Sequence, residues 1–522
     1  GGGEMEEVGS VLEVATPLVF LFTAMIDSPI ALHDYVVVET SELIDKEVKH
    51  LQILAEVIGF EARNPLATPE MALEQKSSLY SYKILRTEIL GYLNGQGRIF
   101  RPKTAPNPGT LVYRADTEIL KPFFKGEEKK IPLYVGQLAR EPEVNVPIHL
   151  QEAQFHIGVF AATRAGKSYL AGKIIEEILE KTVFPVIVVD IHGDYVKMDQ
   201  REMGEEENNF NTIVYQPPGA PKIEGLTADR RELRIGFKQV SIDALLMMLG
   251  GIGEVQRSVI EEILEDLEEK GNPYSIGDVI SIVEERLKEE DEKGKPVLKS
   301  RERGSYMGLL QRLKELARFV PFTDEEVDVG SLFQPKTLSI ICLSGLRESI
   351  QDSLTASIID LIFKHQVATK DNDPQNFIPA FLFIEEAHRV ASGRSRFAVE
   401  TISTAIREGA KYGFFLTIIS QRPRSIDPDV LSNIGNYAVL RITNAQDQHI
   451  IESASESFSH RLVEDLPALN QGEAILVGPF VPLPAHVKVL KRKTVHRGAT
   501  PNLYEIMKSV EERISGWDKS WK

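Results

Sequence analysis

The chain is poor in cysteine: it has only one, Cys342, among its 522 residues. A disulfide within the chain is therefore excluded, and so is a metal cluster held by several cysteines. This composition is typical of proteins from a reducing, cytoplasmic compartment. No run approaches the ~20 consecutive apolar residues of a membrane-spanning helix, so we expect no membrane segment. The N-terminal sequence also lacks the basic start and apolar run of a signal peptide.

Basic residues are also fewer than acidic ones, with 60 Lys and Arg against 77 Asp and Glu. The formal net charge is −17, which argues against a protein that coats nucleic acid over its whole surface. A ring with an acidic exterior and a few basic loops in its channel is compatible with this charge. The length of 522 residues exceeds what one hydrophobic core supports, so we expect two or three domains.

Residues 1–137 have the pattern of a small β-barrel. Segments that alternate apolar and polar residues are predicted as strands at 11–14, 18–22 and 35–38. Residues 46–95 change to apolar spacings of three and four, as at Leu51, Leu54 and Ile58, which predicts a helical insertion. A Pro-rich loop at 101–109 and a following strand complete the predicted domain.

From residue 138 to 500, strands alternate with helices, which predicts an α/β domain with a parallel sheet. Its buried strands are predicted from apolar runs at 155–160, 185–190, 338–343, 380–384, 414–419 and 437–441. A charge-rich helical stretch at about 241–330 is predicted to be a subdomain inserted into this core. Residues 501–522 are predicted to form a helical tail.

A phosphate-binding loop is predicted between the strand at 155–160 and the helix that follows it. Gly166-Lys167-Ser168 matches the end of the pattern G-x-x-x-x-G-K-[ST], whereas Ala161 stands where the first glycine is expected. In such a loop, backbone N–H groups hold phosphate oxygens, the lysine neutralises them and the hydroxyl holds Mg²⁺. We therefore expect ATP and Mg²⁺ as cofactors. The residues expected to bind the nucleotide are Ala162, Thr163, Arg164, Ala165, Gly166, Lys167, Ser168 and Tyr169.

Two adjacent carboxylates, Glu385 and Glu386, follow the apolar strand at 380–384. An apolar strand that ends in two acids, downstream of a phosphate loop, is the Walker B arrangement. We expect Glu385 to hold Mg²⁺ together with Ser168, and Glu386 to polarise the attacking water. His388, two residues on, is either a sensor of the γ-phosphate or a packing residue.

Two further polar residues end predicted strands at the same edge of the sheet. Asp190 ends the strand at 185–190, where it acts in catalysis or at the metal, or caps its own loop. Gln421 follows the strand at 414–419 and is placed to contact the γ-phosphate and respond to its loss. The alternative for Gln421 is a polar strand end with no catalytic role.

Taken in order, these motifs resemble those of the HerA family of hexameric DNA translocases, within the wider group that includes FtsK-type motors. The resemblance covers nearly the whole chain. It rests on the barrel-like N-terminus, the Pro-rich segment 101–109, the phosphate loop, Asp190-Ile191-His192-Gly193-Asp194-Tyr195, Glu385-Glu386-Ala387-His388 and Ser420-Gln421-Arg422-Pro423.

The resemblance implies an N-terminal HAS-barrel domain and a RecA-like P-loop NTPase core. It implies a homohexamer that binds ATP between subunits and passes double-stranded DNA through its channel. It also implies a NurA-type nuclease as partner in DNA double-strand break end resection, alongside the DNA break-processing machinery.

An ATPase whose site lies between subunits needs a basic residue from the neighbouring subunit. Related sequences often carry an arginine-lysine pair in the segment 408–413, where this chain has Ala410 at the first basic position. A lysine there supplies charge without the planar fork of a guanidinium. The candidates for this role are Arg407, Lys411 and Arg422, with Arg164 and Arg441 as further options; the alternative for each is a surface salt bridge.

Basic residues after the second strand of the core are candidates for lining a DNA channel, where they would contact phosphates without reading sequence. They are Lys197, Arg201, Arg230 and Arg231. The alternative is that these residues are exposed charges in a linker.

Three functions are compatible with these motifs: a DNA-pumping motor, an ATP-gated scaffold that docks a partner enzyme, and a secretion-coupling ATPase of the same superfamily. Glu386, the second acid of the pair, favours the motor, because a scaffold that only binds nucleotide does not need it. The lack of a membrane anchor weighs against the secretion-coupling function.

Overall fold

The computed structural model describes residues 5–65, 80–128, 130–498 and 503–514. The chain forms two compact units, one of Gly1–Glu152 with Glu473–Leu490 and the other of Ala153–Gly472 with Lys491–Lys522. The first unit therefore extends beyond the boundary at residue 137 that the sequence predicted, and it takes in a late segment of the chain.

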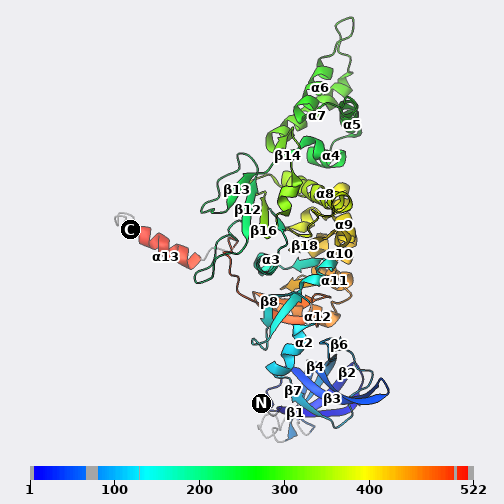
Figure 1. Ribbon diagram of the computed structural model, residues 1–522, viewed down its shortest axis with the longest axis vertical. Helices are drawn as coiled ribbons and strands as arrows, with labels where there is room; N and C mark the ends of the chain where they lie inside the picture. Colours follow the sequence, from blue (N-terminus) through cyan, green and yellow to red (C-terminus); the bar gives the residue numbers. More distant parts are fainter. Residues whose placement is uncertain (1–4, 66–79, 129, 499–502, 515–522) are drawn as a thin grey trace. The chain divides into compact units, whose positions relative to one another are not determined.

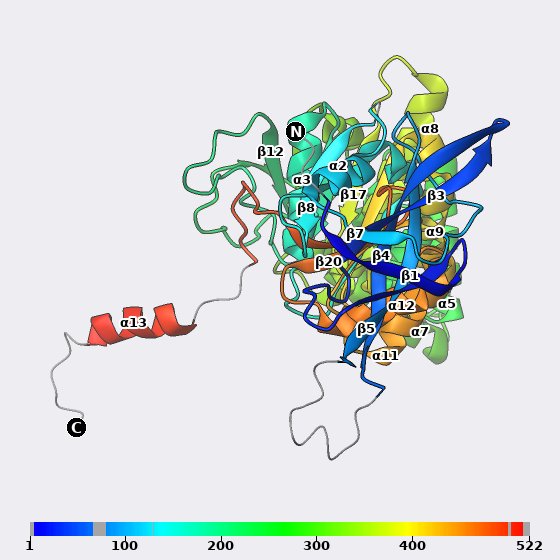
Figure 2. The ribbon, with the colours of Figure 1, turned by 90° about the horizontal axis from the view of Figure 1, so that it is seen from below.

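The first unit contains a closed antiparallel barrel, which confirms the predicted N-terminal β-barrel. Its strands are β1 (Glu7–Ala15), β2 (Val19–Met25), β3 (Tyr35–Ile44), β4 (Glu47–Arg63), β5 (Tyr82–Leu93) and β7 (Leu111–Arg114). They follow the order β2-β1-β7-β3-β4-β5, and pairing of β2 with β5 closes the ring. The short strand β6 (Ile99–Phe100) extends the sheet beside β5. Figure 2 shows β1, β3, β4, β5 and β7 in shades of blue.

The helical insertion predicted at 46–95 is wrong, since this region holds the long strands β4 and β5. Leu51, Ile53 and Ala55 lie at every second position of β4 and belong to the buried core of the barrel. The apolar residues of β4 satisfy a spacing of two as well as spacings of three and four. Barrel closure decides between these patterns, because β4 and β5 each pair along both edges. Part of the predicted insertion, 66–79, lies outside the described residues.

The rest of the first unit is a short helix and a small antiparallel sheet. These elements are α2 (Thr117–Lys125), β8 (Pro132–Leu138), β9 (Asn145–His149), β20 (Glu473–Val477) and β21 (Ala485–Val489). Strand β21 pairs with β20 on one side and with β8 on the other, and β8 pairs with β9. Asp116 caps α2 by accepting a hydrogen bond from the backbone N–H of Ile119 at 2.9 Å.

The second unit is built on a parallel sheet, as predicted. Its strands are β10 (Ile157–Phe160), β11 (Val186–Asp190), β12 (Asn211–Gln216), β13 (Asp229–Glu232), β16 (Thr337–Cys342), β17 (Ala380–Ile384), β18 (Phe414–Ser420) and β19 (Asn436–Leu440). They follow the order β13-β12-β16-β11-β17-β18-β10-β19, and neighbours in this order run parallel. Every residue of β11, β16 and β17 is buried, which explains their largely apolar sequences.

Helices connect these strands in the alternation that an α/β fold requires. They are α3 (Lys167–Lys181), α8 (Glu348–Asn372), α9 (Arg396–Gly409), α10 (Pro428–Ser432), α11 (Ala445–Ala454) and α12 (His460–Asp465). A further helix, α13 (Leu503–Ile514), lies in the predicted tail, whose last residues, 515–522, are outside the described ranges. No helix in the described ranges has the length and apolar character that crossing a bilayer requires.

A group of four helices falls within the stretch predicted as an inserted subdomain at about 241–330. They are α4 (Ile242–Leu249), α5 (Glu254–Glu269), α6 (Ile276–Lys288) and α7 (Ser300–Phe319), which lie together in Figure 1. The two ends of the stretch meet where β14 (Ile235–Gly236) pairs with β15 (Phe322–Thr323). The acidic runs of these helices are largely exposed, as expected for solvated faces.

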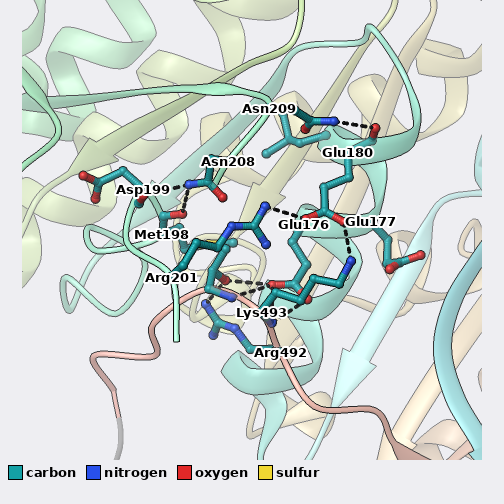
Figure 3. A network of polar contacts seen from close by, with 12 residues as sticks. Glu176, Glu177, Glu180, Met198, Asp199, Arg201, Asn208, Asn209, Arg492 and Lys493 are labelled. Carbon is teal, nitrogen blue, oxygen red and sulfur yellow. Dashed lines mark hydrogen bonds and ion pairs between the residues drawn. The ribbon is translucent and has the colours of Figure 1, made fainter. Parts of the chain in front are cut away.

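Helix α3 is held by a buried network of charges (Figure 3). Its fully buried Glu176 accepts hydrogen bonds from Lys173 Nζ at 2.9 Å, from the backbone N–H groups of Lys493 and Thr494, and from Thr494 Oγ1 at 2.8 Å. Burial opposes ionisation of Glu180, but hydrogen bonds from Arg201 and Lys493 outweigh it and lower the pKa of Glu180. The segment around Lys493 is thereby fastened along the helix that follows the predicted phosphate loop.

Replacing Glu176 should destabilise this unit. The Glu176→Ala change leaves backbone donors unpaired and removes a partner of the buried Lys173, at a cost of about 3 kcal/mol. We expect a lower urea midpoint of unfolding, measured by circular dichroism. The exposed Glu265 on α5 provides a control, since Glu265→Ala should change stability by less than about 0.5 kcal/mol. Equal midpoints for the two variants would show that the network does not stabilise α3.

Candidate active site

The strands that carry the predicted site residues are neighbours in the sheet. Strands β11, β17, β18 and β10 are consecutive in the strand order and all run parallel. Phe160 at the end of β10 is paired with Ser420 at the end of β18. The carboxyl ends of these strands therefore form one edge, which is where open α/β sheets bind ligands.

The phosphate loop joins β10 to α3 with two residues in the left-handed region. These are Arg164, with φ of 65°, and Gly166, with φ of 103°. Ala161 is not among the residues with positive φ, so alanine takes the place of the usual glycine without backbone strain. Helix α3 begins at Lys167 and has no side chain capping its first turn, which leaves N–H groups available to an anion.

Lys167 lies between the two acids of the Walker B segment. Its Nζ is 3.2 Å from Glu386 Oε1 and 3.9 Å from Glu385 Oε2, and its side chain is only 16% exposed. Burial lowers the pKa of Lys167, but the charges of Glu385 and Glu386 outweigh burial, so the net effect is a raised pKa. Lys167 is therefore charged and neutralises part of the carboxylate charge.

Glu385 is oriented by a tyrosine that the sequence analysis did not single out. The hydroxyl of the fully buried Tyr195 donates a hydrogen bond to Glu385 Oε1. Burial raises the pKa of Glu385, against the opposing effects of Lys167 and Tyr195. The other oxygen, Oε2, has no hydrogen-bond partner among the described residues. It is thus a buried acceptor available to a further ligand.

Glu386 is connected to the phosphate loop through Gln421. Gln421 Nε2 lies 3.4 Å from Glu386 Oε2, and Gln421 Oε1 accepts a hydrogen bond from Thr163 Oγ1 at 2.8 Å. Glu386 itself has φ of 50°, a conformation that costs free energy for a residue with a side chain. This backbone conformation sets the direction in which the side chain of Glu386 points from the end of β17.

Asp190 contacts its own loop. Its carboxylate accepts hydrogen bonds from the backbone N–H groups of Gly193, Asp194 and Tyr195 at 2.7, 3.1 and 2.9 Å. Burial raises its pKa to about 7. These contacts favour the loop-capping alternative, in which Asp190 shapes the loop that presents Tyr195 to Glu385.

The loop after β11 also brings the carboxylate of Asp194 close to the start of α3. Ser168 Oγ lies 3.5 Å from Asp194 Oδ2, at the long end of hydrogen-bond range. Asp194 was part of the motif that suggested the family, but no role followed from its position in the sequence. Its proximity to Ser168 comes from the capped turn after β11.

The basic residues proposed to reach a neighbouring subunit are exposed. Arg407 lies on α9, Lys411 follows it, and Arg422 comes directly after Gln421. The backbone N–H of Arg422 donates to Ser420 Oγ at 3.0 Å, while its side chain is exposed. Arg164, in the loop itself, and Arg441, after β19, are exposed as well.

Three of the basic residues suggested for a DNA channel have partners within the second unit. Arg201 pairs with Glu180 at 2.6 Å and its side chain is only 11% exposed, so it belongs to the network under α3 (Figure 3). Arg230 donates to Gln216, and Arg231 is paired with Asp229. A role for Arg201 in DNA binding is therefore wrong, because its guanidinium is committed to the packing of α3.

The site fits a nucleotide with Mg²⁺ on two observations. The uncapped first turn of α3 offers N–H donors to phosphate, and Glu385 Oε2 is a buried acceptor that receives no hydrogen bond from the described residues. Within the described residues, no group of three or more His, Cys, Asp or Glu side chains is placed to hold a metal alone. A magnesium ion here would depend on phosphate and water ligands, as Mg²⁺ does in many nucleotide sites.

Residues 133–362, which include the phosphate loop, match the family model described as the central domain of the helicase HerA. Over this range the chain is similar to the HerA family. It is 27% identical over 454 residues to the DNA double-strand break repair helicase HerA of Pyrococcus furiosus, covering 81% of this chain and 80% of that one. It is 25% identical to the HerA of Saccharolobus solfataricus, covering 97% and 96% of the two chains. With this similarity, this phosphate loop and these carboxylates, the chain is an ATPase.

Solved structures show the same fold at lower identity. VirB4 of Thermoanaerobacter pseudethanolicus superposes with a TM-score of 0.51 at 15% identity, over 70% of this chain and 98% of that one. The bacterial conjugative coupling protein TrwB gives a TM-score of 0.50 at 14% identity, over 74% and 94% of the two chains. The likeness confirms the P-loop NTPase fold of the core.

Proposed function

We propose that this ATPase is an ATP-driven translocase of double-stranded DNA. It would act as a homohexamer in DNA double-strand break end resection, with a NurA-type nuclease as partner. The observation that carries the proposal is Lys167 held between Glu385 and Glu386, with Glu386 connected to the phosphate loop through Gln421. A protein that only binds nucleotide has no need for this second, positioned carboxylate.

The chemistry assigns a separate task to each residue. Residues 162–169 would hold the phosphates of ATP, and Ser168 with Glu385 would hold Mg²⁺. Bound Mg²⁺ would offset the negative charge of the phosphates. Lys167 would turn from the carboxylates to the phosphates, which frees Glu386 Oε1. Glu386 would then accept a proton from the attacking water, a contribution of roughly 10²–10⁴ in rate.

The exposed arginines support a site completed by a second subunit. A guanidinium or ammonium group reaching the γ-phosphate from the neighbour would stabilise the transition state, an effect of about 10³–10⁵ in rate. Arg407, Lys411 and Arg422 are exposed and lie on or after strands and helices that flank the site. We propose that one of them acts in this way in a ring of identical subunits.

The proposed DNA role is supported by the relatives. Several relatives at 25–27% identity are named as DNA double-strand break repair helicases. The net charge of −17 restricts DNA contacts to a limited basic surface. Non-specific phosphate contacts on such a surface would make DNA binding strongly dependent on salt.

Duplex DNA should stimulate ATP hydrolysis. We expect the steady-state ATPase rate of the wild type to rise several-fold with blunt-ended DNA and to lose this stimulation at high salt. The Glu386→Gln variant should bind a fluorescent ATP analogue normally and lose about 10²–10⁴ in turnover. Lys167→Ala should lose both binding and turnover.

The controls separate the parts of this proposal. A wild-type rate that DNA does not change would contradict the translocase and leave the ATPase intact. Normal turnover by Glu386→Gln would contradict the assignment of the catalytic base. Retained ATP binding by Lys167→Ala would contradict the phosphate loop.

Inactive subunits should complement one another if sites form between subunits. In a ring of mixed subunits, equal amounts of Lys167→Ala and a variant lacking the neighbour-acting residue restore about a quarter of the interfaces. We therefore expect activity from a mixture of Lys167→Ala with one of Arg407→Ala, Lys411→Ala or Arg422→Ala. Size measurement by light scattering with ATP present should give a hexamer. A monomer, or no complementation by any mixture, would contradict a shared site.

A further inference from the structure

A series of polar contacts leads from the segment after β18 to the proposed catalytic base. The backbone N–H of Arg422 donates to Ser420 Oγ at 3.0 Å, and Ser420 Oγ lies 3.0 Å from His388 Nδ1. On the other side of the ring, His388 Nε2 lies 3.4 Å from Glu386 Oε2. Ser420, His388 and Glu386 are all buried.

The partners in this chain determine where the protons lie. Because Ser420 Oγ accepts a hydrogen bond from Arg422, its own hydrogen is free to be donated to His388 Nδ1. Nε2 faces the carboxylate of Glu386, which can only accept, so the single proton of a neutral imidazole is favoured on Nε2 and Nδ1 accepts from Ser420 Oγ. Burial lowers the pKa of His388, which favours the neutral ring.

The two oxygens of Glu386 are thereby made unequal. Two nitrogen atoms lie 3.4 Å from Oε2: Gln421 Nε2, which donates a hydrogen bond to it, and His388 Nε2. Oε1 faces Lys167 Nζ at 3.2 Å. When Lys167 turns to a phosphate, Oε1 is the oxygen left without a donor and able to accept a proton. His388 and Gln421 keep the carboxylate from rotating.

We propose that His388 is a positioning residue for ATP hydrolysis, which holds Glu386 Oε2 and ties the catalytic carboxylate to the segment that carries Gln421 and Arg422. The inference rests on the proposed role of Glu386 as the base. His388 does not contact the nucleotide or the water; it acts through Glu386. Arg422 stands at the outer end of this series of contacts, and its exposed side chain lies at the protein surface.

Substitutions of His388 test this role, because loss of a positioning residue should lower kcat for ATP hydrolysis and leave KM for ATP nearly unchanged. An amide at position 388 can keep one half of the ring's hydrogen bonding: glutamine places its N–H near the position of Nε2, and asparagine near that of Nδ1. We expect His388→Ala and His388→Asn to lower kcat by ~10–100-fold, with KM for ATP within about threefold of wild type. His388→Gln should recover most of the rate. Ser420→Ala should lower kcat in the same direction by a smaller factor, again without changing KM.

Two further measurements guard against a purely structural effect. His365 is half-buried on α8, where it stacks on Phe333 and takes no part in the contacts around His388. His365→Ala should therefore leave kcat unchanged. In the background of Glu386→Gln, the added His388→Ala change should lower the residual rate by less than about twofold, because a residue that acts only through Glu386 has nothing left to position.

The outcomes distinguish this inference from the proposed function. If Glu386→Gln hydrolyses ATP at the wild-type rate, the assignment of the base fails and this inference fails with it. If Glu386→Gln is inactive but His388→Ala and Ser420→Ala keep the wild-type kcat, only the positioning role is overturned. Equal losses from His388→Ala with and without Glu386→Gln, or no recovery in His388→Gln, would also overturn it. If His388→Ala does not fold, His388→Gln and Ser420→Ala decide by the same criteria.

Discussion

The ion pairs of Lys167 with Glu385 and Glu386 are the interaction on which the rest of the site depends. Two carboxylates at the end of one buried strand repel each other, and burial raises the pKa of Glu385. Lys167 opposes both effects, since it lies 3.2 Å from one acid and 3.9 Å from the other. The phosphate loop and the Walker B segment are thereby joined. Phosphate would compete for the same lysine, so nucleotide binding would release Glu386, the proposed catalytic base.

The surrounding structure keeps each partner in place. Tyr195 holds Glu385 from the loop that Asp190 caps, and Gln421 holds Glu386 from β18. The hydrogen bonds and ion pairs around Glu176 hold helix α3, whose first residue is Lys167. The helix and the strand ends therefore form a rigid frame around a small number of charged groups. Within that frame, few atoms besides the lysine side chain need to move.

Local patterns in the sequence predicted the core well. Apolar runs located the buried strands, and the order of the phosphate loop and the acid pair predicted the edge at which they meet. Prediction was wrong at 46–95, where one apolar pattern suits both a helix and the strands that close the barrel. Tyr195, Asp194 and Ser420 were missed because their roles come from tertiary contacts. Arg201 was misjudged for the same reason, since its pairing with Glu180 is absent from any local pattern.

The most direct test of this account is a structure of the Glu386→Gln variant with ATP and Mg²⁺. We predict that the phosphates lie against residues 162–169 and that Lys167 Nζ contacts them, at more than about 4 Å from the side chain at position 386. Tyr195 should still donate to Glu385. A structure in which Lys167 stays beside Glu385 and position 386 while ATP is bound elsewhere would contradict the account, because phosphate would then not compete with the carboxylates for Lys167.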